Sequence, residues 1–120
     1  DEDWKKLERT LGLPAAETDL NEAWRGEGLA TLLSVGGKSG FNALRTGGNL
    51  YQREAGNFFE NKDKAWYFWT ATSIMLQDSI PAAYVRLSDH FTTKVWRGTS
   101  RVANNYRPVL YSVRCVKDLK

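Results

Sequence analysis

The chain has 120 residues, of which 42% are hydrophobic and 12% aromatic, which suffices for one buried core but not for two domains of ordinary size. Lys and Arg total 17 against 14 Asp and Glu, so the formal charge is only +3, and the scattered basic residues disfavour nucleic acid as a partner. No stretch approaches the roughly 20 consecutive apolar residues of a membrane span. We therefore expect residues 1–120 to form one soluble domain with no direct membrane span.

Two helices are predicted at the start of the chain. Over residues 2–11, Trp4, Leu7 and Leu11 recur at helical spacing with charged residues between them, and a glycine and a proline follow as a stop signal. A second, short helix is predicted next, before two further glycines. Its apolar face would hold Leu20, Ala23 and Trp24. Its cap would be Thr18, Asp19 or Asn21.

A loop-rich middle is predicted for residues 34–57, because glycines recur there beside Ser, Asn and Lys without helical or strand periodicity. Short apolar anchors within it are expected at Phe41, Leu44 and Tyr51. Residues 65–72 are dense in aromatic and β-branched side chains, which predicts a central strand.

An antiparallel hairpin is predicted for residues 83–97, with Ser88, Asp89 and His90 in its turn. Alternation assigns one set of side chains to the interior: Ala83, Val85, Leu87, Phe91, Thr93 and Val95. It assigns the other set to the exterior: Tyr84, Arg86, Ser88, Thr92, Lys94 and Trp96.

The C-terminal part is predicted as a loop over residues 97–108 and a last strand over residues 110–116. Cys115 lies between apolar neighbours in that strand and is expected to be a small buried side chain. Helices first, then a glycine-rich region, then antiparallel strands is the order of an α+β fold.

Little in the sequence indicates catalysis. The single histidine, His90, lies at a predicted turn with no serine elbow, and G-G-K-S at residues 36–39 lacks the first glycine of a phosphate-binding loop. The single cysteine excludes an internal disulfide or a two-thiol redox pair. We expect no enzyme activity and no cofactor. A calcium site made from loop carbonyls stays open, because such ligands leave little trace in a sequence.

A recognition surface within residues 73–111 is the remaining candidate for function. Amphipathic aromatic and arginine side chains supply much of the energy at binding surfaces. The candidate ligand-binding residues are Tyr84, Arg86, His90, Trp96, Arg97, Arg101, Asn104 and Tyr106. Tyr84, Trp96 and Tyr106 would be anchors, and the arginines and His90 would give polar specificity. The alternative is that the rings pack on the loop region and the charged residues are simply solvated.

Several motifs together resemble a known family. S-G-F-N-A-L at residues 39–44, G-G at 47–48, W-x-x-W-T-A-T at 66–72 and S-V-R-C-V-K-D at 112–118 are similar to the Fibrobacter succinogenes major paralogous domain of Bacteroidetes and related bacteria. The resemblance implies a C-type-lectin-like fold of the kind seen in formylglycine-generating enzyme. It also implies that the first strand, with a partner for Cys115, lies upstream of Asp1. The enzyme's chemistry does not carry over, because it needs a pair of cysteines.

A narrower resemblance is to the variable proteins of diversity-generating retroelements, which share this fold and often end in S-V-R-C-V. In those proteins the stretch before this ending is rewritten at adenine-bearing codons, and the mixed residues 73–78 and 102–110 fit such a history. Leu110 departs from it, standing where a glycine is common. The resemblance implies display outside the cell, on its surface or on a phage particle, toward a protein or glycan on another cell or host surface. The alternative is a fixed structural or adhesive module of a bacterial envelope protein.

Overall fold

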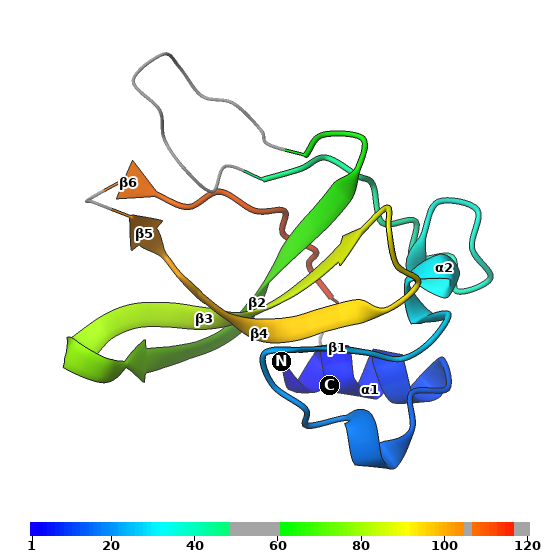
Figure 1. The fold of residues 1–120 in the computed structure, drawn as a ribbon, viewed down its shortest axis with the longest axis horizontal. Helices are drawn as coiled ribbons and strands as arrows, with labels where there is room; N and C mark the ends of the chain where they lie inside the picture. The colour runs from blue at the N-terminus through cyan, green and yellow to red at the C-terminus, as the bar shows by residue number, and fades with distance from the viewer. Residues whose placement is uncertain (49–60, 105–106, 117–120) are drawn as a thin grey trace.

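Two α-helices and a four-stranded antiparallel sheet form the main part of the chain in a computed structural model that describes residues 1–48, 61–104 and 107–116 (Figure 1). The long β2–β3 hairpin extends away from the helices (Figure 1). No helix within these ranges is long and apolar enough to cross a membrane. In chain order the elements are α1 Glu2–Thr10, the 3₁₀ turn η1 Ala15–Glu17, β1 Ala23–Arg25, α2 Leu29–Leu33, β2 Ala65–Leu76, η2 Gln77–Ser79, β3 Ile80–Asp89, β4 Val95–Arg101, β5 Ala103–Asn104 and β6 Arg107–Pro108.

The first helix is confirmed. Acidic Glu2 and Asp3 lie in the first turn of α1 and basic Arg9 in the last, which suits the helix dipole. The backbone N–H groups of Leu11 and Gly12 close the helix by donating to carbonyls of its last turn.

The sheet has the strand order β1-β4-β3-β2, and every neighbouring pair is antiparallel. The predicted hairpin is therefore confirmed as β3 and β4. The predicted strand at 65–72 is confirmed as part of the longer β2, but its predicted central position is wrong, because β2 lies at one edge of the sheet. Among the described residues, Gly47 and Ser112 make isolated parallel bridges to residues 66 and 68 on the other side of β2.

The core lies between the sheet and the helices. The ring of Trp4 in α1 packs against Phe41, Trp66 and Phe68 at centroid distances of 5.2, 6.3 and 5.7 Å. Leu33 of α2 is completely buried in the same cluster. The other buried members are Leu13, Leu29, Ala30, Ala43 and Val95.

Some predictions of local structure are wrong. Residues 97–108 were predicted as a loop, but they contain most of β4 and the short strands β5 and β6. The predicted second helix is replaced by η1 and β1, because Trp24 pairs with Trp96 of β4, a contact that no local pattern reveals. Residues 110–116 form no regular strand and make only isolated bridges, and Cys115 is exposed there. Leu44 is 59% exposed and anchors nothing, and Tyr51 lies outside the described residues.

Candidate binding face

The register of the strands divides the sheet into two chemically different faces. Residues directly opposite each other in antiparallel strands share a face. One face, which we call the helix face, packs against α1 and α2. It carries Arg25, Trp66, Phe68, Arg86, Val95 and Arg97. The opposite side, which we call the aromatic face, carries Trp24, Tyr67, Trp69, Val85, Leu87, Trp96 and Gly98.

The helix face holds a buried cluster of ion pairs. Glu8, which is 0% exposed, accepts hydrogen bonds from Arg25 at 2.6 and 2.9 Å and from Arg86 at 2.9 to 3.2 Å. Asp1 accepts from Arg86 at 2.7 Å and from Arg97 at 2.8 and 3.2 Å. Two carboxylates therefore pair with three guanidinium groups of the sheet.

This cluster serves the fold and leaves its arginines without a free surface. Burial lowers the pKa of Arg86 below its ordinary value, and the hydrogen bonds to Glu8 oppose that shift. A buried charge that kept no partner would be very costly, so both carboxylates are needed where they lie. Arg97 also stacks over the ring of Tyr84, with its carbon Cζ 4.5 Å from the ring centroid.

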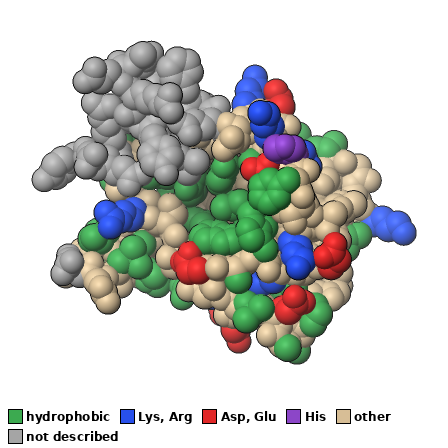
Figure 2. All heavy atoms as spheres, in the orientation of Figure 1, with side chains coloured by type: hydrophobic (Ala, Val, Ile, Leu, Met, Phe, Trp, Pro, Cys, Tyr) green, Lys and Arg blue, Asp and Glu red, His purple; other side chains and the backbone are tan. Residues whose placement is uncertain are grey.

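The aromatic face has no such charges at its centre. Trp24, Trp96 and Leu87 lie side by side across β1, β4 and β3, and all three are half-buried. Neither helix packs against this side. In the space-filling view, hydrophobic side chains gather in the middle of the visible surface with charged side chains around them (Figure 2).

The indole of Trp96 lies flat on its own strand. A Cβ at Gly98 would be 2.1 Å from Cη2 of Trp96 and 2.4 and 2.6 Å from its neighbours Cζ2 and Cζ3. Such similar distances indicate that the ring stands face-on over Gly98, since an edge-on ring would place Cζ2 and Cζ3 well beyond Cη2. Because Trp96 is only half-buried, its other face is available for contact.

The turn between β3 and β4 continues this aromatic surface. Phe91 is 68% exposed and meets the ring of Trp24 edge-on at a centroid distance of 5.5 Å. His90 is exposed beside it, with Nδ1 and the backbone N–H both next to a carboxylate oxygen of Asp89. Phe91 was predicted to face inward, and this prediction is wrong.

At the β2 end of the aromatic face, the C-terminal segment contributes Tyr111. Its ring stacks on Tyr67 at 5.2 Å and meets Trp69 at 4.6 Å. Its hydroxyl lies 3.2 Å from the hydroxyl of Ser100 on β4.

The predicted binding residues do not come together as one surface. Arg86 and Arg97 are buried against α1, and Tyr84 shares their face of the sheet, so all three predictions of exterior positions are wrong. Trp96 lies on the opposite side, beside Leu87, while Arg101 is exposed at the end of β4. The side chain of Asn104 and all of Tyr106 lie outside what the structure describes.

The residues that reasoning from the sequence missed are Trp24, Trp69, Leu87, Phe91 and Tyr111. One signal was available for Leu87, because alternation from Trp96 across the hairpin places both on one face. This signal was missed because arginines were assumed to face solvent. Glu8 was also missed, although it follows Trp4 by one helical turn and therefore shares its buried side of α1.

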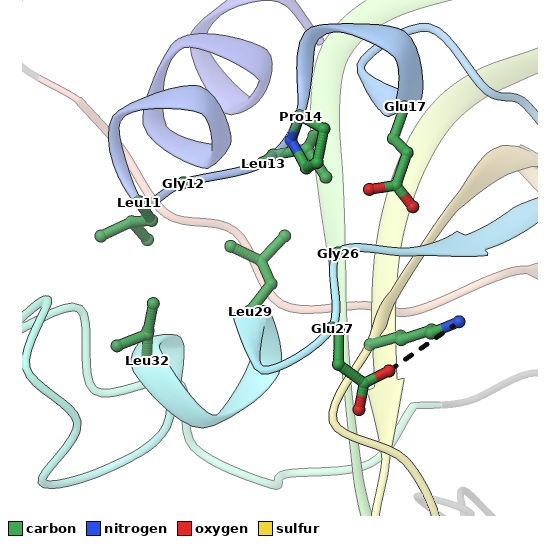
Figure 3. A pocket seen from close by; sticks show the side chains of 10 residues that line it. Leu11, Gly12, Leu13, Pro14, Glu17, Gly26, Glu27, Leu29 and Leu32 are labelled. Atoms are coloured by element: carbon green, nitrogen blue, oxygen red, sulfur yellow. Dashed lines mark ion pairs between the residues drawn. The ribbon is translucent and has the colours of Figure 1, made fainter.

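A small pocket lies between the end of α1 and α2 (Figure 3). Its volume is about 220 Å³, below the roughly 300–1,000 Å³ of pockets that enclose a whole ligand. Leucines form its walls and Glu17 points toward it, while Glu27 turns to Lys94 at 4.0 Å (Figure 3). Across residues 1–48, 61–104 and 107–116, no three His, Cys, Asp or Glu side chains gather in a way that could hold a metal ion.

Comparison with known proteins gives one match. The sequence model of the family described as the Fibrobacter succinogenes major domain matches residues 1–117, almost the whole chain. No curated protein and no solved structure matches the chain significantly.

Proposed function

The chain belongs to the Fibrobacter succinogenes major domain family, and on this premise we propose that it is a non-catalytic recognition domain that binds a ligand through the aromatic face of its sheet. We further propose that the α+β arrangement is a C-type-lectin-like fold, displayed outside the cell or on a phage particle toward a protein or glycan of another cell. The observation that supports binding is the row of half-buried rings on the side of the sheet opposite the core.

A sheet face that stays apolar in contact with water is unfavourable in free energy. Aromatic side chains in contact with water lose the favourable transfer free energy of burial, roughly 25 cal/mol per Å². A face that only had to be solvated would carry polar side chains at alternate positions. Trp24, Leu87 and Trp96 occupy those positions instead, and tryptophans such as Trp24 and Trp96 are enriched at the hot spots of recognition surfaces.

A test is to label the exposed thiol of Cys115 with a fluorescent dye and measure binding to a panel of intact bacterial cells by flow cytometry. Cys115 is suitable because its neighbour Arg114 stacks over Phe41, on the helix side of the molecule. Phe91→Ser should weaken binding at least several-fold. Val35→Ser is the matched control, since Val35 is a comparably exposed apolar side chain, at 62%, but follows α2 and lies outside the sheet. Equal binding by the two variants, or no cell bound by the wild type, would count against the proposal.

The retroelement hypothesis is a separate proposal with its own test. Residues 73–111 include the fully buried Arg86 and Val95, so any diversification compatible with the fold must spare such positions. Comparing these codons among sibling genes should show substitutions only at exposed positions. A constant stretch would instead favour the fixed adhesive module.

A further inference from the structure

We infer that the ligand of the aromatic face is a neutral carbohydrate, one of whose sugar rings stacks on the flat indole of Trp96. This inference rests on the proposed function and specifies its ligand class. Three properties of the described surface support it: the orientation of Trp96, the distribution of charge, and the size of the surface.

The orientation of Trp96 suits a flat, rigid partner. Gly98 has no side chain, so the indole rests on the strand and presents its other face parallel to the sheet. The face of an aromatic ring is electron-rich and its edge electron-poor. One side of a pyranose ring is a flat array of C–H groups, whose weakly positive hydrogens complement that face.

The charge distribution favours a neutral ligand. Three of the four arginines of β1, β3 and β4 are turned to the helix face and paired with Glu8 or Asp1, and the fourth, Arg101, lies at the far end of β4. The carboxylate of Glu22 is also engaged away from the rings: its Oε1 accepts hydrogen bonds from the backbone N–H and the hydroxyl of Thr99, both at 2.9 Å, and Thr99 lies opposite Tyr84 on the helix face. The rings of Trp24 and Trp96 therefore have none of these paired arginines beside them to attract an acidic sugar.

The size of the surface is small for a protein partner. With side chains of 150–250 Å² each, the exposed parts of Trp24, Leu87, Phe91 and Trp96 amount to something on the order of 300 Å². A stable protein interface buries roughly 800 Å² on each partner. A few sugar residues match the smaller figure, and Ser100, half-buried on the same face two residues after Gly98, offers a hydroxyl beside them.

The experiment uses an array of neutral and sialylated oligosaccharides, followed by calorimetric titration of the best-bound neutral oligosaccharide. Gly98→Ala is the decisive variant, because the added Cβ forces the ring of Trp96 off the strand while the residue itself remains. We expect an affinity loss of tenfold or more for Gly98→Ala and for Trp96→Ala. We expect Trp96→Tyr to retain binding within a few-fold, and Val35→Ala, outside the sheet, to bind as the wild type. Thermal melting of each variant, and of the double variant Gly98→Ala with Trp96→Ala, shows whether the fold is kept.

The outcomes separate the two proposals. In one outcome, binding to cells survives periodate oxidation, is abolished by protease and still depends on Phe91. This result would overturn the carbohydrate as the ligand while leaving recognition by the aromatic face intact. Binding to a neutral oligosaccharide that Gly98→Ala leaves unchanged in a folded protein would overturn the stacking on Trp96. Preference for sialylated oligosaccharides would overturn the argument from charge. If the aromatic-face variants bind as Val35→Ala does, the proposed function itself is refuted.

Discussion

Replacing Glu8 by Gln should be among the most destabilising single changes in this domain. Glu8 is 0% exposed and is the partner of Arg25 and Arg86, both also completely buried. Gln keeps the length of the side chain but removes its charge and one acceptor oxygen. Two guanidinium groups would then share one neutral carbonyl in a buried site. The Nε atom of Arg25 already lacks a hydrogen-bond partner, so the site has no acceptor to spare for its arginines.

The expected loss is about 3–5 kcal/mol, the cost of breaking a buried ion pair by removing one partner. Domains of this size are stable by roughly 5–15 kcal/mol in total. At roughly 4 °C per kcal/mol, the melting temperature should fall by about 12–20 °C. Urea unfolding followed by tryptophan fluorescence measures the free energy of unfolding directly, and an unchanged m-value would show that the folded state is still compact.

The matched control is Glu2→Gln on the same helix. Glu2 pairs with Lys5 at 3.0 Å, but its side chain is 72% exposed, so the control should leave the urea midpoint nearly unchanged. A loss below about 1 kcal/mol for Glu8→Gln would refute the view that this carboxylate neutralises the buried arginines. A double-mutant cycle with Arg86→Gln should show strong coupling, because the two residues share one site.

Three further predictions concern the core, the pH dependence and the thiol. Leu33→Ala should cost about 2–5 kcal/mol in urea unfolding because Leu33 is completely buried, whereas Leu44→Ala, at a 59% exposed position, should cost far less; similar losses would place the core elsewhere. The hydrogen bond between Lys5 and Asp19, at 2.7 Å, lowers the pKa of Asp19 below its ordinary value of 3.8 and raises the pKa of Lys5 above 10.5. The carboxylate's contribution to stability is therefore present above pH 3.8 and lost as the pH falls through the lowered pKa, while that of Lys5 is lost as the pH rises beyond its raised pKa. Melting curves between about pH 5 and pH 2 should show a smaller drop for Asp19→Asn than for the wild type, and an equal drop would contradict the pairing. Cys115, exposed in the structure, should react with a chromogenic disulfide reagent in native buffer as completely as in urea; protection in native buffer would contradict its placement.

Elements that are marked by a pattern among neighbouring residues were predicted from the sequence. The helical spacing of Trp4, Leu7 and Leu11 identified α1, and alternation identified β3 and β4 with a turn near His90. The short β1 could not be found this way, because its three residues form a strand only through pairing with β4, far along the chain.

The candidate site was predicted in part, and the error has a physical cause. Trp96 was correctly placed on the exterior, but Arg86 and Arg97 were placed there with it. Reasoning from a strand alone treats arginine as a surface residue. Here the helix supplies Glu8 and Asp1 as partners, which turns Arg86 and Arg97 toward the helices, while Val85 on the other side of β3 is buried as predicted. Only knowledge of which helix face meets which sheet face could have supplied this.

The ion-pair cluster also affects how the chain can acquire its structure during synthesis. It joins Glu8 to Arg86 across 78 positions of sequence, and Asp1 to Arg97 across 96. Contacts of such high sequence separation slow folding, because a long loop must close before they form. Because α1 precedes β3 and β4 in the chain, Glu8 and Asp1 find their arginine partners only after those strands have been made. Nascent chains that end before β4 cannot complete the cluster, which makes them natural targets for chaperones and proteases.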